Sequence, residues 1–144
     1  MMKIRSPKDT KDPAVTRPLK IEHREIGCTQ FEVVNNSEYC GKIFIQRQGT
    51  TTPAHSHNNK HETFLIWSGR VRMVIDGQPI DMKPGDVLSV ERGTVHEFTA
   101  LESDAVLFEF STPSLPKDSY FSRDDDWERV NRRSGVTRDY EWPF

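Results

Sequence analysis

Three of the five histidines in this chain lie within one short stretch, at His55, His57 and His61, and Glu62 follows directly. Imidazole nitrogens and carboxylate oxygens are common ligands of divalent first-row metals, so this cluster could hold such an ion. A polar loop that is merely rich in histidine is the alternative. The spacing of these residues, and the strands that would carry them, decide between the two interpretations.

Strand geometry brings two of these histidines together with the carboxylate. Side chains in a β-strand alternate between faces, so His55 and His57 point the same way. A loop over residues 58–61 returns the chain, and Glu62 begins the next strand, so that His57 and Glu62 can meet inside a barrel. The same alternation places His61 opposite Glu62, which predicts a position at the rim rather than in the ligand set.

A fourth candidate ligand lies far downstream. His96 follows the turn at Gly93 and precedes another run of strand-forming residues. Three neutral imidazoles and one carboxylate form a competent site for one divalent transition metal (Mn, Fe, Zn or Ni), with two positions left for substrate or water. The predicted ligands are His55, His57, Glu62 and His96.

The spacing of these residues resembles the two motifs of the cupin superfamily. The second motif is matched only in part, because Glu91 stands where it usually has Pro and Ala100 where it usually has Asn. The resemblance covers about residues 38–112. The first motif is matched at every fixed position by Gly49, five residues, His55, one residue, His57, four residues, Glu62, six residues and Gly69, and the second by Gly85, Gly93 and His96.

The elements around these residues predict an all-β fold. Between Leu19 and Pro113, short runs of β-branched, aromatic and aliphatic residues alternate with turn signals such as Asp76-Gly77. The cupin resemblance implies a single barrel of the double-stranded β-helix, or jelly-roll, type. The predicted strands cover residues 20–26, 30–34, 41–46, 63–68, 70–75, 79–82, 86–90, 96–99 and 105–110.

The flanks differ in composition from this barrel, which we place at residues 19–116. Residues 1–18 are charged and interrupted by prolines, which predicts an extended or disordered arm. Residues 117–144 form an extension with one short helix from Trp127 to Arg133, capped by Asp125 or Asp126 and ended by Gly135. The aromatic residues of this extension predict packing on the barrel or on a partner subunit: Trp127, Tyr140, Trp142 and Phe144.

Bulk composition narrows the range of partners and locations. The formal net charge of −2 offers no basic excess for a nucleic-acid backbone. The first residues contain no apolar segment of a signal peptide, and no apolar run is long enough to span a bilayer, so we expect a cytoplasmic protein. Cys28 and Cys40 are most simply reduced, buried thiols, although the sequence leaves a disulfide between them open.

The last barrel strand supplies a candidate catalytic group. Leu107 and Glu109 share one face of residues 105–110, and Phe108 lies on the other. If the first face looks inward, as we expect of Phe64, Ile66 and Phe98 elsewhere, Glu109 lies near the metal and could act as a general base. The alternative is that Glu109 is exposed or pairs with an arginine. For Arg47 and Lys60, a solvated position is favoured over one that lends charge to the barrel mouth.

Cupins differ widely in activity, so the resemblance leaves three functions open. The general residue pattern of the chain is similar to that of small cupins that isomerise sugars or sugar phosphates. This resemblance implies a metal-stabilised enediolate intermediate and a carboxylate that moves the proton between adjacent carbons. A non-haem Fe(II) dioxygenase is the first alternative, and a non-enzymatic cupin that binds a small molecule is the second. Because exposed strand edges need covering, a homodimer is expected, with residues 1–26 crossing to the second subunit.

Overall fold

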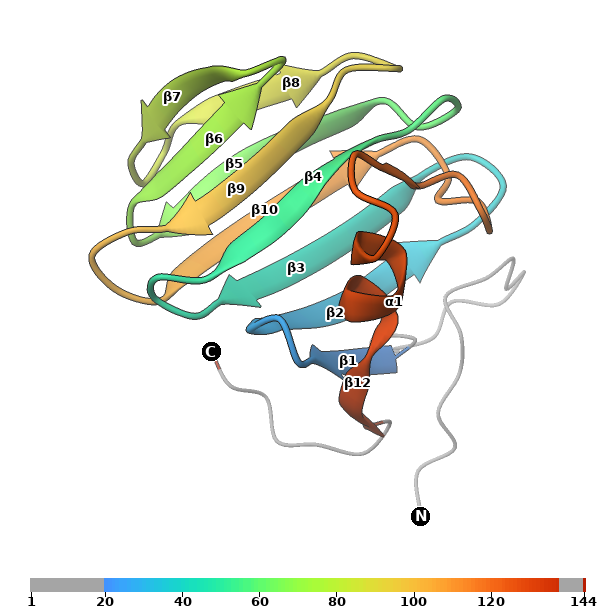
Figure 1. The fold of residues 1–144 in the computed structure, drawn as a ribbon, viewed down its shortest axis with the longest axis horizontal. Coiled ribbons are helices and arrows are strands. Elements are labelled where there is room, and N and C mark those ends of the chain that lie inside the picture. The colour runs from blue at the N-terminus through green and yellow to red at the C-terminus, as the bar shows by residue number, and fades with distance from the viewer. Residues whose placement is uncertain (1–19, 138–143) are drawn as a thin grey trace, which may run out of the picture.

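Two antiparallel β-sheets face each other in a computed structural model, which describes residues 20–137 and 144 (Figure 1). For residue 20 and residues 133–137 the backbone alone is described. The predicted all-β fold is confirmed, whereas the arm at residues 1–18, Tyr140 and Trp142 lie outside the described residues.

One sheet has seven strands in the order β12-β1-β2-β3-β10-β5-β8, and the other has five in the order β11-β4-β9-β6-β7. The strands are β1 (Lys20–Arg24), β2 (Cys28–Asn35), β3 (Cys40–Gln46), β4 (Thr51–Ser56), β5 (Glu62–Ser68), β6 (Val71–Ile75), β7 (Gln78–Met82), β8 (Val87–Val90), β9 (His96–Ala100), β10 (Ala105–Ser111), β11 (Tyr120–Phe121) and β12 (Arg133–Thr137). One helix, α1, covers Asp126–Asn131.

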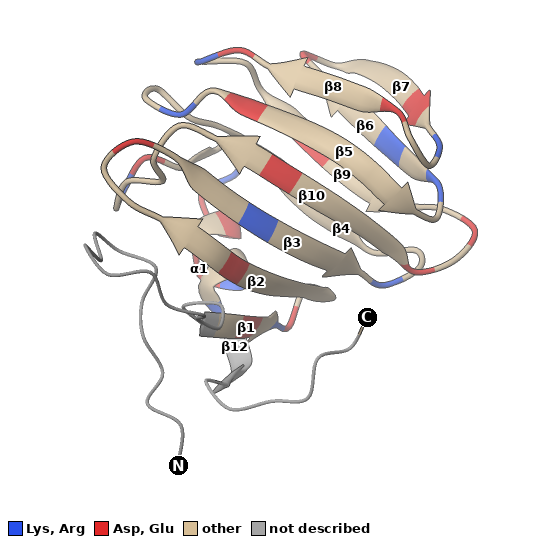
Figure 2. Cartoon of the chain, turned by 180° about the vertical axis from the view of Figure 1, so that it is seen from behind, with Lys and Arg blue, Asp and Glu red and all other residues tan. Residues whose placement is uncertain are grey.

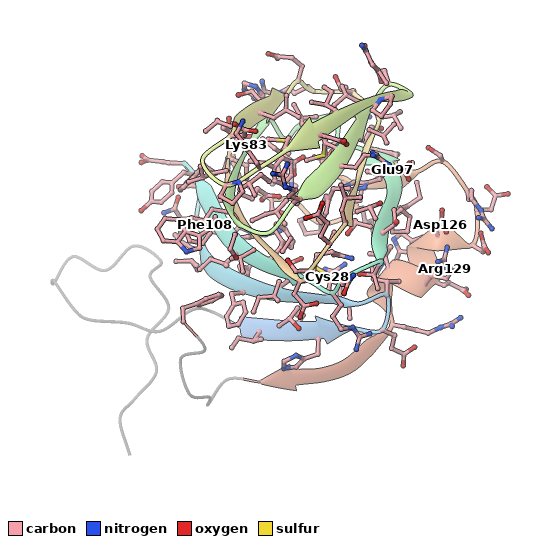
Figure 3. All side chains as sticks on the ribbon, turned by 90° about the vertical axis from the view of Figure 1, so that its left-hand side faces the viewer. Cys28, Lys83, Glu97, Phe108, Asp126 and Arg129 are labelled. Carbon is pink, nitrogen blue, oxygen red and sulfur yellow. The ribbon has the colours of Figure 1, made fainter. Side chains whose placement is uncertain are left out.

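Alternating side chains of both sheets form the core between them, as period-2 strands require. Leu107 is fully buried there, while Phe108 stacks on Trp67 on the other side of its sheet. Figure 3 shows Phe108 pointing out from the seven-stranded sheet. The core cluster contains Phe64, Ile66, Val71, Met73, Met82, Val90, Phe98, Ala100, Ala105 and Leu107.

Local turn chemistry fixes the hairpin between β6 and β7. Asp76 and Gly77 both have positive φ, at 47° and 81°, as the favoured two-residue hairpin turn requires. This bears out the turn expected at Asp76-Gly77. The two cysteines are both buried and free, and burial raises the pKa of Cys28 to about 12, so this thiol stays neutral.

The end of the chain departs from the sequence-based expectation. The helix begins at Asp126 and ends at Asn131, because Arg132 leaves helical geometry at φ −67° and ψ 121°. Gly135 does not end the helix but lies in β12, which pairs with β1. Residues 20–24 of the expected crossing arm therefore form β1 within their own sheet, between β12 and β2.

The helix covers one open end of the barrel. In Figure 1, α1 lies in front of β2 and β3, and it contacts β4 and β11. Its residue Val130 is buried, whereas Trp127 is 56% exposed, so the expected packing of Trp127 is only partial. No helix among the described residues is long and apolar enough to cross a membrane.

Candidate metal centre

Three histidines come together at one end of the barrel interior. His55 lies on β4, His57 directly follows that strand, and His96 begins β9, where it pairs in register with His55. One ring nitrogen from each histidine lies within 4.8 Å of the other two. This arrangement could hold a metal ion, and it unites three of the four ligands that the sequence predicts.

Backbone carbonyls orient all three rings in the same manner. The Nδ1 atoms of His55, His57 and His96 lie 2.8, 2.9 and 2.9 Å from the carbonyl oxygens of Pro53, Asp118 and Thr94. A carbonyl only accepts, so each Nδ1 donates its proton and the Nε2 lone pair is left for another partner. This is the usual environment of metal-binding histidines.

The carboxylate of Glu62 faces two of these rings. Its Oε2 lies 2.9 Å from Nε2 of His96, and its Oε1 lies 3.5 Å from Nε2 of His57. Yet Oε2 and both Nε2 atoms are buried without a hydrogen-bond partner among the described residues. Two acceptors so close require a positive charge between them, either a proton or a metal ion. The donor set therefore fits a divalent cation.

The pKa shifts of two histidines reflect this crowding. Burial and the positive charges that His96 and His57 can carry lower the pKa of His55 to about 3, so this ring stays neutral. Burial also lowers the pKa of His96, but its contact with Glu62 outweighs that effect and raises it above the ordinary value. In the absence of a metal, a proton on Nε2 of His96 would lie between this atom and Oε2 of Glu62, and His96 would donate it to the carboxylate.

Lys60 is buried in this site, and the expectation of a solvated position was wrong. Its side chain is 5% exposed, and Nζ lies 2.7 Å from Oε1 of Glu62 and 3.4 Å from Oε1 of Glu109. Lys60 turns inward because these two buried carboxylates need a counter-charge. Arg47 is exposed, as expected.

Glu109 points into the barrel, on the same face as Leu107, and is 2% exposed. One lysine cannot neutralise two carboxylates, and the closer contact goes to Glu62. Burial alone would raise the pKa of Glu62, but His57, His96 and Lys60 hold it well below its usual range. Burial raises the pKa of Glu109, and the charge of Glu62 adds to this effect against that of Lys60.

A cavity of about 270 Å³ connects these groups. Its polar wall comes from both sheets, and its cover comes from the C-terminal segment through Phe121, Trp127 and Val130. The remaining lining is partly aromatic. The residues that matter for chemistry are His55, His57, Lys60, Glu62 and Glu109, and those near them are Arg24, Cys28, Gln30, Lys42, Phe44, Phe64, Phe98 and Ser114.

Asp118 supports the site from a position that sequence reasoning missed. Its carbonyl orients His57, and its buried carboxylate accepts hydrogen bonds from the backbone amides of Asn58 and Asn59. No local pattern marks this residue, since its contacts are far away in the sequence. His61, by contrast, lies at the rim as predicted, 3.6 Å from the exposed Glu91.

The chain is similar in sequence and in fold to several known proteins. Residues 42–111 match the family model described as a cupin domain. The D-lyxose/D-mannose isomerase of Thermosediminibacter oceani is 28% identical, and the match covers 62% of this chain and 64% of the relative, less than two thirds of its length. Quercetin 2,3-dioxygenase of Bacillus subtilis is 43% identical over 31% of this chain and 13% of its own length. The solved structure of Cellulomonas parahominis L-ribose isomerase has the same fold, with a TM-score of 0.66, 16% identity and 72% of each chain covered.

Proposed function

Since residues 42–111 of this chain match the family model of a cupin domain, we propose that the protein is a metal-dependent enzyme that isomerises or epimerises a small sugar. This proposal rests on three converging histidine ring nitrogens, with the carboxylate of Glu62 facing His57 and His96 and a second buried carboxylate, that of Glu109, beside them. The names of a D-lyxose/D-mannose isomerase and an L-ribose isomerase among the similar proteins support the substrate class.

The proposed ligands are His55, His57, Glu62 and His96, for one divalent Mn, Fe, Zn or Ni. When bound, such an ion supplies Lewis-acid polarisation of a sugar carbonyl and its adjacent hydroxyl. The buried Nδ1 contacts hold the three rings in one orientation, so little reorganisation accompanies binding.

Proton transfer is assigned to Glu109. Its carboxylate lines the same cavity as His55 and His57, and burial raises its pKa toward the range in which a carboxyl group can both accept and return a proton. Glu109 would remove the proton from one carbon and return it to the neighbouring carbon. Lys60, 3.4 Å from Oε1 of Glu109, holds the carboxylate in place.

A non-haem Fe(II) dioxygenase is the second candidate, and two observations favour it. Aromatic side chains line part of the cavity, among them Phe44, Phe64 and Phe98. A short segment of the chain is 43% identical to a quercetin 2,3-dioxygenase. The same four ligands would then hold iron, with substrate and dioxygen in the open positions. A binding protein without turnover is the third candidate.

Metal content by mass spectrometry, on tag-free protein purified without oxygen, tests the proposal. We expect near-stoichiometric Mn, Zn, Ni or Fe, lost in the double variant His55→Ala, His96→Ala and retained in the control His61→Ala. Turnover of aldoses or ketoses would then follow metal content. Bound iron with oxygen uptake on diols or diketones would favour the dioxygenase. Failure of the wild type to bind any metal, even after reconstitution, would contradict both the isomerase and the dioxygenase proposals.

A further inference from the structure

A buried cation, Lys42, lines the cavity without a close ion pair among the described side chains. Lys42 on β3 is 9% exposed, and its recorded hydrogen bond runs from Nζ to Oγ of Ser114 at 3.3 Å. No carboxylate lies within 4.0 Å of this Nζ among residues 21–132 and 144, whose side chains the structure describes. Burying a charge is costly unless it is paired, and a bound anion would pair Lys42 more closely than the acids on the two neighbouring strands do.

A second buried polar side chain, Gln30, lies near Lys42 on the neighbouring strand β2 and is 7% exposed. Both Gln30 and Lys42 line the cavity that contains His55, His57 and Glu109. They also line a shallower hollow beside it, so they lie where the cavity meets the surface.

The acidic residues near Lys42 are already engaged or do not reach it. Glu109 is its direct neighbour in register on β10, but its Oε1 contacts Lys60 and its Oε2 accepts from Oγ of Ser111. Glu32 is its neighbour in register on β2, and no contact within ion-pair distance joins the two. Figure 2 shows this row of charged residues across β2, β3 and β10 from behind.

The buried charges in and beside the cavity are balanced once Glu22 is counted with its partner Arg24. Arg24, Lys42, Lys60 and Lys117 line the cavity, against the two acids Glu62 and Glu109. Lys60 is matched by both acids, and Arg24 is paired with Glu22 at 3.1 Å, although its buried Nε lacks a partner. The exposed Lys117 adds one positive charge to this balance, and a divalent ion at the histidines would add two more. A neutral ligand would leave these added charges uncompensated.

We propose that the substrate is an anionic sugar, whose carboxylate or phosphate group is held by Lys42 and Gln30 while its other end lies at the three histidines. This inference rests on the proposed function and narrows its substrate class. The strand order supports it, because β3 and β5 flank β10, so about 10 Å across the sheet separate the backbones that carry Lys42 and Glu62. Both side chains line the same cavity, so one extended ligand can contact both.

Binding affinity tests this inference without any need for turnover. Calorimetry on metal-loaded protein would compare mannose, glucose and lyxose with their uronates and terminal phosphates, and would include inorganic phosphate as a probe without stereochemistry. We expect at least one anion to bind more tightly than its neutral counterpart. Lys42→Gln should lower that affinity about tenfold to a hundredfold, the effect of losing a charged hydrogen-bond partner, and leave neutral sugars unaffected.

Three further variants make the test specific. Lys42→Arg keeps the charge and should retain most of the affinity, whereas Gln30→Glu places a negative charge beside Lys42 and should lower it. The control is Lys83→Gln, since Lys83 is exposed and lies far from the cavity residue Cys28 (Figure 3). If Lys42→Gln fails to fold, Gln30→Glu and Lys42→Arg decide the question.

The outcomes separate this inference from the proposed function. Equal affinity for neutral and anionic ligands, or an anion affinity that Lys42→Gln leaves unchanged, would overturn the anionic subsite even if neutral sugars are isomerised. If the protein binds no metal but still binds an anion through Lys42, the subsite is supported and the proposed metal-dependent function is contradicted. A preference for uronates over phosphates, or the reverse, identifies the anionic group.

Discussion

At the scale of single residues, backbone carbonyls determine the chemistry of the histidine cluster. Because Pro53, Thr94 and Asp118 accept from Nδ1, every Nε2 is left as a lone-pair donor toward a common point. A cluster of neutral, buried imidazoles binds protons poorly and metals well. Protons and metal ions should therefore compete at this site.

We expect the metal-free protein to lose stability as the pH falls below about 6.5. The folded state lowers the pKa of His55 to about 3, so the unfolded chain binds a proton that the folded protein does not. His96 has the opposite sign: its raised pKa gives stabilisation that is complete below pH 6.5 and is lost as the pH rises through its folded value. A loss of stability between about pH 6.5 and 5 is therefore assigned to His55.

Urea unfolding in the presence of a chelator, across this pH range, measures the effect. His55→Asn removes the titrating ring and should flatten the decline in unfolding free energy, whereas His61→Asn, at the rim, should leave it as in the wild type. A decline that His55→Asn leaves intact would show that another group is responsible.

At the scale of elements, the C-terminal segment completes a site that the two sheets begin. β11 pairs with β4, so that Phe121 lies opposite His55, and α1 packs beside the same strand. Asp118, just before β11, holds the loop after His57 through the amides of Asn58 and Asn59. The segment therefore positions a ligand strand and covers the cavity at once.

We expect Asp118→Ala to weaken metal binding about tenfold to a hundredfold, the usual effect of losing groups that support a ligand. The variant keeps the carbonyl that accepts from His57 but loses the carboxylate that fixes the loop. Competition with a coloured chelator measures the affinity. Asp124→Ala is the matched control, because Asp124 is exposed. Equal affinities in the two variants would show that the loop needs no such support.

At the scale of the whole molecule, the outer face of the seven-stranded sheet is apolar. Trp67 on β5, Phe110 on β10 and Val87 on β8 are all more than half exposed on this face, and Trp67 stacks on Phe108. An exposed apolar face of this kind is typical of an interface between protein subunits. The homodimer remains our proposal, and this face, rather than a crossing arm, is the surface we assign to it.

Light scattering after size-exclusion chromatography should give twice the 16.7 kDa mass of the chain. The double variant Trp67→Lys, Phe110→Lys places two charges on the apolar face and should give the mass of one chain. Tyr39→Lys changes an exposed aromatic residue in the loop between β2 and β3, and should keep the wild-type mass. A single-chain mass for the wild type would refute the dimer.

Strand faces, tight turns and the spacing of the predicted ligands follow from local rules that can be read along the chain. Alternation along β10 placed Leu107 and Glu109 on one face, and the Asp76-Gly77 pair determined its hairpin. The short strand β12 was not predicted, because its residues resemble a polar tail and become a strand only by pairing with β1. Sequence boundaries for the barrel and its flanks stay predictions.

The sequence by itself determined which residues could meet a metal, because His55, His57 and Glu62 are joined by one strand and one short loop, whose geometry is local. Only the tertiary structure decided what surrounds them. Lys60 turned inward because Glu62 and Glu109, the latter from a distant strand, both need a counter-charge. The carboxylate of Glu109 contacts Lys60 and Ser111, so Lys42 beside it has no ion pair within 4.0 Å among the described side chains. Charge balance in a buried site depends on all the strands that meet there, and no periodicity along one strand encodes it.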